Sequence, residues 1–547
     1  MAVSSDSSGW PLTEAQSGLW YAQRLDPANP LFNTGQYIEL VGALDLDAFR
    51  SAVTTAVEEA EALALRVVDA AEGPRQLLDP SRRPRLEVVD VSGAADPLAA
   101  AEADIARDMA TPIDPTRDPL AAERLFMLGP QRFVWQQRIH HLAIDGYGMI
   151  LLTQRVADLY NACRRGTAAG PALPGLDVVL AEDAAYRGSD KRQADAAYWR
   201  ETFAGQPEVV SLAAGAPVSA FGFHRRAVEI DAATIARLHG LARESSIPWP
   251  DLLTAFCAAY VQRHTGTPEV VLGVPHMGRL GSKAARVPAM LMNVLPLRVA
   301  QQPGVTRADF LASVSRSLMK ARRHGRYRSE QLRRDLKLIG RQRRLHGPLV
   351  NVLPFDETPR FEGLDARLEV LSAGPVDDIT FTFRAHGAGG LRLEIDANPD
   401  LYSADEALAH ARRLDAFIAG ALAAERLDEV PTATPEEARR HLVEMNATAH
   451  EVPDVTLTAL VEAAMRRMPD APAVRFEGVE LSYAELERRS AALASALTDA
   501  GAGPGVLVAV ALPRSLELIV ALVAGLGGGA AHLPHGLPPP PPPLSPP

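Results

Sequence analysis

RIHHLAIDGYGM, residues 138–149, is the stretch that decides the fold of this chain. The segment that leads into it, RFVWQQRI (132–139), has the aromatic and β-branched content of a strand. Behind the motif, apolar residues recur at helical spacing, at Met149, Leu152, Val156, Leu159 and Cys163. The motif is therefore predicted to lie where a strand ends and a helix begins, a position from which a rigid scaffold can hold an imidazole toward a cleft.

Two interpretations of these residues are open. In the structural one, Asp145 caps the helix and His140 and His141 are satisfied residues at a sheet edge. In the functional one, an imidazole faces a cleft, and Gly146 lets a substrate approach the backbone closely. A lone histidine favours the structural interpretation. Two histidines, a spacer of three and then Asp-Gly form a much rarer combination, which favours function.

Working outward, the chain alternates strands and helices on both sides of the motif. GQYIELVG (35–42) is predicted as a strand and DLDAFRSAVTTAVEEAEAL (45–63) as a helix, so residues 10–175 form one α/β lobe. A Pro-, Gly- and Ala-rich loop follows at 167–177, and a second alternation begins at AVEIDAATIARLHGLARES (227–245). Residues 176–430 are predicted to form a second α/β lobe.

The C-terminal part has a different organisation. Residues 431–450 combine prolines with polar residues and are interpreted as a linker. Residues 451–534 alternate helix and strand, as in the opening of a third α/β domain, which the chain does not complete. The stretch then becomes almost pure proline, so residues 535–547 are expected to be a disordered Pro-rich tail. A reading-frame shift explains this abrupt switch better than an evolved tail does.

Composition and charge limit the classes of partner. The 547-residue chain has a net charge of -11, so neither nucleic acid nor membrane is expected as a partner. Its two cysteines, Cys163 and Cys257, lack disulfide or metal-ligand spacing, and no metal site is predicted. The first nine residues lack the basic and apolar regions of a secretion signal, so a cytoplasmic protein is expected.

HHLAIDG (140–146) resembles the HHxxxDG signature of the condensation domains of nonribosomal peptide synthetases, in the chloramphenicol-acetyltransferase-like superfamily. The further stretches that resemble motifs of this family follow in order: LTEAQSGLW (12–20), YW (198–199), GR (278–279), LMNVLPLR (291–298), RRHGRYRSEQL (322–332) and GPLVNVLPF (347–355). The resemblance covers residues 10–430 and implies a V-shaped pair of acetyltransferase-like lobes. LSYAEL (481–486) and LVAGLGGGAAHLP (522–534) resemble the start of an adenylation domain. Several stretches, AGPVDD (373–378) among them, are most similar to the synthetases that join an aryl acid to serine in enterobactin-type siderophore assembly.

The resemblance implies a reaction and roles for residues. A carrier-bound amine would attack an acyl or aryl thioester on an upstream carrier protein, and the product would remain on a downstream peptidyl carrier domain. Phosphopantetheine arms would present both substrates, and no cofactor would be bound by the chain itself. His141 would face the reacting groups beside His140, as a general base or as a positioning group. Asp145 would pair with Arg279 across the lobes, and Asn351 would be a polar residue of the cleft.

The sequence also departs from the family pattern. Leu63-Ala64 stands where the family usually has Leu-Arg, although Arg66 is nearby, and Gly148 replaces a usual serine. The chain contains no glycine-rich phosphate loop of Thr/Ser-Gly-Lys character, so adenylation activity and amino-acid-dependent pyrophosphate exchange are not expected.

Two further predictions concern a basic segment, residues 320–344, and the functions that compete with condensation. Residues 320–344 contain 11 Lys and Arg against 2 acids, either as a solvated helical face or as a docking surface for acidic carriers. The rivals are a stand-alone CoA-dependent acyltransferase and a non-catalytic remnant that only docks carriers. An epimerisation domain shares the His-His motif but normally follows a carrier domain, and a heterocyclising domain would have Asp in place of His140.

Overall fold

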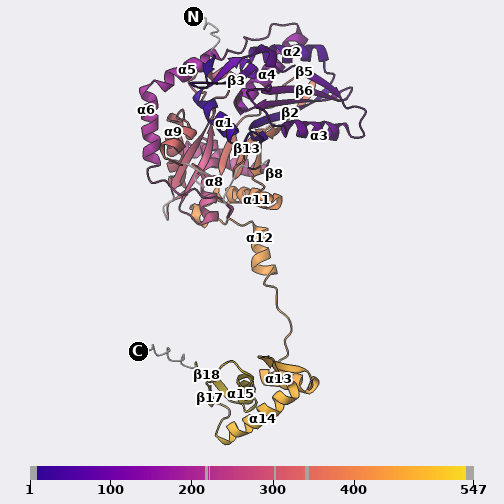
Figure 1. Cartoon of the computed structure of the whole chain (residues 1–547), viewed down its shortest axis with the longest axis vertical. Helices are drawn as coiled ribbons and strands as arrows, with labels where there is room; N and C mark the ends of the chain where they lie inside the picture. The colour runs from indigo at the N-terminus through magenta and orange to yellow at the C-terminus, as the bar shows by residue number, and fades with distance from the viewer. Residues whose placement is uncertain are drawn as a thin grey trace. The chain divides into compact units, whose positions relative to one another are not determined.

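The computed structural model describes residues 9–215, 220, 222–300, 304–338, 344–387 and 389–536 (Figure 1). The chain forms two compact units, which divide between Arg439 and Arg440. This division falls inside the stretch interpreted as a linker, 431–450. Helix α12 (Pro435–Arg439) belongs to the first unit, because Glu437 forms an ion pair of 2.8 Å with Arg413.

The first lobe is built on a five-stranded sheet with the order β12-β2-β7-β6-β5. Its strands are β2 (Asn33–Gly42), β5 (Leu86–Asp90), β6 (Ala121–Gly129), β7 (Arg132–His140) and β12 (Leu364–Ser372). Helices α2 (Leu46–Glu59) and α4 (Gly146–Arg165) share one apolar core with Trp135 and Ile139 of β7. Helix α3 (Pro97–Met109) packs with Val134, on the other face of the same strand. Adjacent residues of β7 therefore serve different cores.

Strand β12 corrects the division of the two lobes into consecutive segments. The predicted boundaries place residues 364–372 in the second lobe, yet these residues pair antiparallel with β2 at the edge of the first-lobe sheet. The reason is the alternation of Leu364, Ala366 and Leu368, which pack against the first-lobe core. The chain therefore leaves the second lobe and returns to it within one crossover.

The second lobe contains a six-stranded sheet with the order β10-β9-β11-β13-β14-β8. Its strands are β8 (His224–Glu229), β9 (Glu269–His276), β10 (Asn293–Ala300), β11 (Leu349–Leu353), β13 (Ile379–His386) and β14 (Gly390–Ala397). Its helices include α7 (Ala232–Ser245), α8 (Trp249–Thr265), α9 (Arg307–Arg323) and α11 (Ala404–Ala421). Helix α8 is apolar on nearly all sides and is buried through most of its length, as expected of a helix at the centre of a core.

Shorter elements complete the first compact unit. They are the helices α1 (Glu14–Leu25), α5 (Asp177–Arg187), α6 (Asp190–Thr202) and α10 (Ser329–Asp335), and a small sheet of β1 (Trp10–Pro11), β4 (Gly73–Leu78) and β3 (Leu65–Ala70). Helix α1 begins with a capping box in which Thr13 and Gln16 bind each other's backbone N–H groups. The family-like stretch at 12–20 is thus the start of this helix.

The second unit is small. It contains α13 (Leu457–Arg467), β15 (Pro472–Phe476), β16 (Val479–Ser482), α14 (Tyr483–Asp499), β17 (Leu507–Val510), α15 (Leu516–Gly527) and β18 (Ala531–Pro534). Five residues, Met465, Leu481, Leu486, Leu516 and Val520, form its core. Of the tail predicted at 535–547, residues 537–547 lie outside the described residues.

Within the described ranges, no helix is both long enough and apolar enough to cross a membrane.

Candidate active site

The motif lies where the sequence predicts it, between strand β7 and helix α4. β7 ends at His140, and α4 begins at Gly146 after a turn of five residues. Asp145 is the N-cap of α4, and its Oδ1 accepts a hydrogen bond of 2.7 Å from the backbone N–H of Gly148. The prediction of a strand end followed by a helix start is confirmed, and so is the capping role that the structural interpretation gave to Asp145.

His141 is held in one tautomer. Its Nδ1 is 2.8 Å from the carbonyl oxygen of Ile144, and a carbonyl can only accept, so Nδ1 carries the proton. Its backbone N–H donates to the carbonyl of Phe32 at 2.7 Å. Burial lowers the pKa of His141, and the positive charge of Arg328 acts in the same direction. The ring is therefore neutral at pH 7, and its Nε2 lone pair forms no hydrogen bond within the described residues.

His140 has the opposite tautomer and a structural environment. Its Nδ1 accepts the backbone N–H of Leu142 at 3.1 Å, so the proton is on Nε2, which lies 3.3 Å from Oε1 of Gln23. Burial lowers the pKa of His140 to about 3, and neighbouring His141 and Arg138 add to this effect. Both ring nitrogens are thus occupied, which leaves His141 as the histidine with a free nitrogen.

Asp145 points away from the histidine pair into a buried network. Its Oδ1 forms a 2.8 Å ion pair with Arg279, and its Oδ2 accepts the backbone N–H groups of Leu291 and Met292, both at 2.9 Å. The side chains of Asp145 and Arg279 are only 1% and 4% exposed. The pairing that the resemblance implied is present. With four donors on its two oxygens, this carboxylate holds backbone rather than relaying protons.

Arg279 extends this network along the segment that follows β9. Its Nη1 donates to the carbonyl of Val287 at 2.7 Å and its Nη2 to that of Ala289 at 2.9 Å. Its guanidinium also lies 5.2 Å from the ring centroid of Tyr147, over the first turn of α4. The pair therefore ties the segment 279–292, which leaves the second-lobe sheet after β9 and packs in the first-lobe core, to the start of α4.

Glycine is needed for different reasons at the two glycine positions of the motif, 146 and 148. A Cβ on Gly146 would meet no atom within 4 Å, so the space above this residue is open to a ligand. A Cβ on Gly148 would lie 2.6 Å from Cγ1 of Ile144 and 3.2 Å from the backbone of Ala289. Glycine in place of the usual serine therefore lets the 279–292 segment pack directly on α4.

Gly374 belongs to the site, and sequence reasoning missed it. A Cβ built on Gly374 would lie 3.1 Å from Cδ2 and 3.4 Å from Nε2 of His141, and the residue has φ +113°. Gly374 follows β12, so the crossover strand brings it to His141. The glycine within the family-like stretch AGPVDD (373–378) was the one available signal.

Other predicted residues lie elsewhere. Asn351 is half-buried in β11, and its side chain forms no hydrogen bond within the described part of the chain. The Tyr327 hydroxyl donates to Asp335, which makes it part of the α10 packing. Arg66 is exposed on β3 beside Asp79, at 4.0 Å. None of the three has a described contact with His141.

The basic segment 320–344 is only partly free. Arg322 pairs with Asp251 at 2.7 Å, and the guanidinium of Arg334 lies 5.9 Å from the ring centroid of Tyr21. Residues 339–343 lie outside the described residues. Some of these charges therefore stabilise the fold, and a docking role for the rest stays a prediction.

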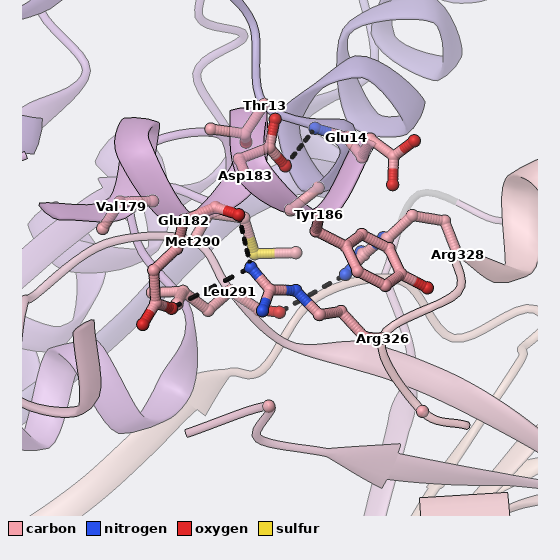
Figure 2. Close-up of a pocket in the computed structure, with 13 residues that line it drawn as sticks. Thr13, Glu14, Val179, Glu182, Asp183, Tyr186, Met290, Leu291, Arg326 and Arg328 are labelled. Atoms are coloured by element: carbon pink, nitrogen blue, oxygen red, sulfur yellow. Dashed lines mark hydrogen bonds and ion pairs between the residues drawn. The ribbon is translucent and has the colours of Figure 1, made fainter. Parts of the chain in front are cut away.

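Two pockets are lined by neighbours of the motif turn, Leu291 in the first and Gly374 in the second. Figure 2 shows the first, a polar pocket of about 540 Å³ including its opening to solvent, in which Arg326 faces α5 and donates to the backbone of Glu182 at 2.8 Å. Arg328 also lines it, and this is the residue whose charge acts on His141. The second is a cavity of about 1240 Å³, including its opening to solvent, that is lined partly by Gly374 and Asn33.

In the described ranges, no group of three or more His, Cys, Asp or Glu is arranged to hold a metal ion.

Comparison with known proteins agrees with this geometry. The profile of the condensation domain family matches residues 7–442, and that of the AMP-binding enzyme family matches residues 461–540. A dimodular nonribosomal peptide synthase of Bacillus subtilis is 40% identical over 530 residues, which are 96% of this chain and 22% of that protein. Enterobactin synthase component F of Escherichia coli O157:H7 is 34% identical over 535 residues, 96% of this chain and 41% of that protein. The chain thus spans between about a fifth and two fifths of the length of these relatives.

Solved structures give the same answer for the fold. The starter condensation domain of rhizomide synthetase, in complex with C8-CoA, superposes with a TM-score of 0.72 at 33% identity, covering 78% of this chain and 98% of that one. The first condensation domain of the CDA synthetase gives 0.71 at 32% identity, covering 78% and 99%. The paired lobes, the histidine turn and the buried Asp145–Arg279 clamp therefore have one explanation: the chain belongs to the condensation domain family of nonribosomal peptide synthetases, and part of an AMP-binding domain follows.

Proposed function

We propose that this chain catalyses the condensation step of a nonribosomal peptide synthetase. In this step the amine of an aminoacyl thioester attacks the carbonyl carbon of an acyl thioester. The observation that carries the proposal is the free Nε2 of a neutral His141, in a turn whose neighbours Leu291 and Gly374 line two separate pockets. A reaction between two tethered substrates needs two approaches to one centre.

His141 would act through its unprotonated nitrogen. Nε2 can accept a hydrogen bond from the attacking amine, which orients the nitrogen lone pair toward the thioester. As the C–N bond forms and the C–S bond breaks, a proton leaves the nitrogen and the departing sulfur takes one up. General-base help of this kind is typically worth about 10² to 10⁴ in rate, so positioning can contribute as much as proton transfer.

The start of α4 supplies donors for the oxyanion. The backbone N–H groups of Gly146 and Tyr147 precede the first intrahelical bond and form no hydrogen bond within the described residues. The Asp145–Arg279 pair fixes this turn, and Gly146 leaves it uncovered. In our proposal the tetrahedral oxyanion is held here, where the helix N-terminus favours negative charge.

The wider assignments rest on the family. We propose that both substrates arrive on phosphopantetheine arms, the donor from an upstream acyl or aryl carrier protein and the acceptor from a downstream peptidyl carrier domain. We further propose a cytoplasmic location and a siderophore product. The likeness to enterobactin synthase component F supports the siderophore assignment.

The test uses the full chain with loaded carriers. Upstream and downstream carrier proteins bearing acyl and aminoacyl arms are incubated with it, and mass spectrometry of the pantetheine arm detects the amide. His141→Ala should reduce amide formation by at least about 10²-fold, the lower end for loss of a general base. His386→Ala is the matched control, because this histidine is exposed and, among the described residues, its ring pairs with Glu229 at the end of β8.

Three results would count against the proposal. Amide formation by His141→Ala at the wild-type rate would remove the histidine assignment. Transfer from soluble acyl-CoA that gains nothing from a carrier would favour a stand-alone acyltransferase. Carrier binding without any amide from the wild-type chain would favour a non-catalytic docking protein.

A further inference from the structure

We propose that the cavity between α3, residues 29–37, the end of β12 and residues 222–223 is the pocket for the acyl group of the donor thioester. The structure assigns it to an uncharged, largely apolar acyl group. This inference rests on the condensation function proposed above, and it specifies the substrate class for one of the two pockets.

The position of the cavity relative to His141 is the first argument. Gly374 lines the cavity, and it is also the residue whose Cβ position is 3.4 Å from Nε2 of His141. Asn33, on the opposite wall, is the register partner of His140, and the carbonyl of the preceding Phe32 accepts the N–H of His141. A thioester carbonyl held beside Nε2 therefore has the cavity directly next to it.

The chemistry of the wall is the second argument. Most of the lining is apolar, with contributions from Leu31, Ile105, Ala106, Met109, Leu371 and Val376. The charged residues that line it are Glu102 and Glu369, both acidic, and no Lys or Arg is present among the described lining residues. A carboxylate on the acyl chain would lose water next to like charges and find no cation.

The arginine that stacks on the cavity wall is already paired. Arg225 stacks on Phe223, which lines the cavity, with 4.9 Å between the guanidinium carbon and the ring centroid. Its guanidinium forms two hydrogen bonds to Asp396, of 2.7 and 2.8 Å. This arginine is therefore neutralised and does not offer its charge to a ligand.

The polar atoms of the wall agree with this assignment. Asn33 is buried, and its Nδ2 donates to the carbonyls of Met109 and Thr111, whereas its Oδ1 has no partner in the described part of the chain. The Tyr37 hydroxyl donates to Glu102 at 3.2 Å, and burial together with Glu102 raises the pKa of Tyr37 to about 12. The free acceptor on Asn33 cannot pair with a carboxylate, which only accepts.

The other pocket suits the acceptor better. Its wall carries acidic groups, Glu14, Glu182 and Asp183, as well as the basic Arg326 and Arg328, and several of them are paired with neighbouring side chains. Such a mixed wall accommodates a polar amine and its amide neighbours at lower desolvation cost than an apolar wall does. The donor acyl group brings no amine to the reaction and can be wholly apolar. The larger apolar cavity therefore fits the donor, and the smaller polar pocket of Figure 2 fits the acceptor.

The test fills the cavity from α3. Ala106 lines it and is exposed, so Ala106→Trp adds bulk without disturbing a core. Ala103 is exposed on the same helix outside the cavity wall, and Ala103→Trp is the matched control. Each protein receives an equimolar mixture of acetyl, octanoyl and suberoyl groups on one carrier protein, with the aminoacyl N-acetylcysteamine thioester that the wild type uses best in a panel. Product ratios are read by mass spectrometry and do not depend on the folded fraction.

We expect the wild type to prefer octanoyl over suberoyl, the matched C8 chain with a terminal carboxylate, by at least about tenfold. Ala106→Trp should lower the octanoyl-to-acetyl ratio by a similar factor, and Ala103→Trp should leave it within about twofold. If Ala106→Trp yields no soluble protein, Ala110→Trp on the same wall replaces it.

The experiment distinguishes a wrong pocket assignment from a wrong assignment of the condensation function. An unchanged octanoyl-to-acetyl ratio in the cavity variant, or a preference for suberoyl, overturns the pocket assignment while amide formation stands. No amide from the wild type with any donor and acceptor overturns the condensation function itself.

Discussion

Gly374 limits the space beside the His141 ring on the side of Cδ2 and Nε2. It is buried at the end of the crossover strand, and its φ of +113° is one that side chains rarely adopt. Because Gly374 has no side chain, it leaves room for the His141 ring. A methyl group at this position would lie 3.1 Å from Cδ2 of the ring. Hydrogen bonds to Ile144 and Phe32 of the first lobe thus orient His141, and Gly374 at the end of the crossover strand limits the space beside its ring.

Gly374→Ala should lower kcat/KM for condensation by at least about tenfold, because displacing a reacting group by a fraction of an ångström to an ångström is costly. Gly73→Ala is the control. Gly73 has φ +111° but no atom within 4 Å of its Cβ position, so it shares the backbone strain without the contact. Equal activity losses of the two variants in steady-state assays would show that backbone strain, and not the contact with His141, causes the loss.

His140 makes a prediction about pH and stability. Its pKa is lowered to about 3 by burial, against 6.5 in an unfolded chain, so below pH 6.5 the unfolded state binds a proton that the folded state refuses. Its contribution to stability is therefore lost as the pH falls from 6.5 toward 3. Between pH 7 and pH 5 this loss amounts to about 2 kcal/mol, at about 1.4 kcal/mol for each pH unit below 6.5.

His140→Gln should remove that part of the pH dependence. Urea unfolding followed by tryptophan fluorescence at the two pH values measures it in the full chain, because all five tryptophans lie before residue 440. If wild type and variant lose the same unfolding free energy between pH 7 and pH 5, His140 is protonated in the folded state and its assigned tautomer is wrong.

At the scale of elements, the Asp145–Arg279 clamp connects the start of α4 with the segment after β9. Asp145 caps the helix, binds Arg279 and accepts two backbone N–H groups at 291–292. A buried ion pair of this kind does not by itself show high stability, but breaking it leaves an unpaired charge. The clamp thus makes the geometry of the turn depend on both lobes.

Asp145→Ala should therefore lower the unfolding free energy by about 3 to 5 kcal/mol. Glu229→Ala is the control, since its pairs with His386 and Arg392 are exposed and should change stability by less than about 1 kcal/mol. Urea unfolding by tryptophan fluorescence measures both variants. A loss for Asp145→Ala no greater than that of the control would mean that the network is dispensable for folding.

At the scale of the whole molecule, the chain consists of two compact units with separate cores. Residues 445–456 join them through exposed positions without helix or strand. Such a stretch accepts insertion because no buried group or ladder hydrogen bond is disturbed. The motif turn and both pockets lie within the first unit.

A site-specific protease sequence inserted after residue 450 should allow cleavage of the native chain into the two units. We expect condensation activity within about twofold of the uncut protein and an unchanged tryptophan melting curve, because domains with their own cores fold independently. Gel electrophoresis checks the cut, and the uncut insertion variant is the control. Loss of activity on cleavage would mean that the second unit contributes to catalysis.

Sequence alone determined the local features. Helical spacing after Gly146 and the aromatic and β-branched content before His140 placed the motif in a strand–turn–helix, since both signals are local to the chain. The motif order gave the family and named Arg279 as the partner of Asp145. The local features required no knowledge of long-range packing. The pairing of Arg279 with Asp145 does depend on packing, and it came from the family resemblance.

Tertiary structure alone decided which residues meet. The return of β12 to the first-lobe sheet, the approach of Gly374 to His141 and the apolar cavity beside it join residues that are more than 200 positions apart. Asn351, by contrast, has no described contact with the site. Side-chain periodicity fixes which face of an element is buried, but the partner that buries it depends on how complete sheets and helices pack.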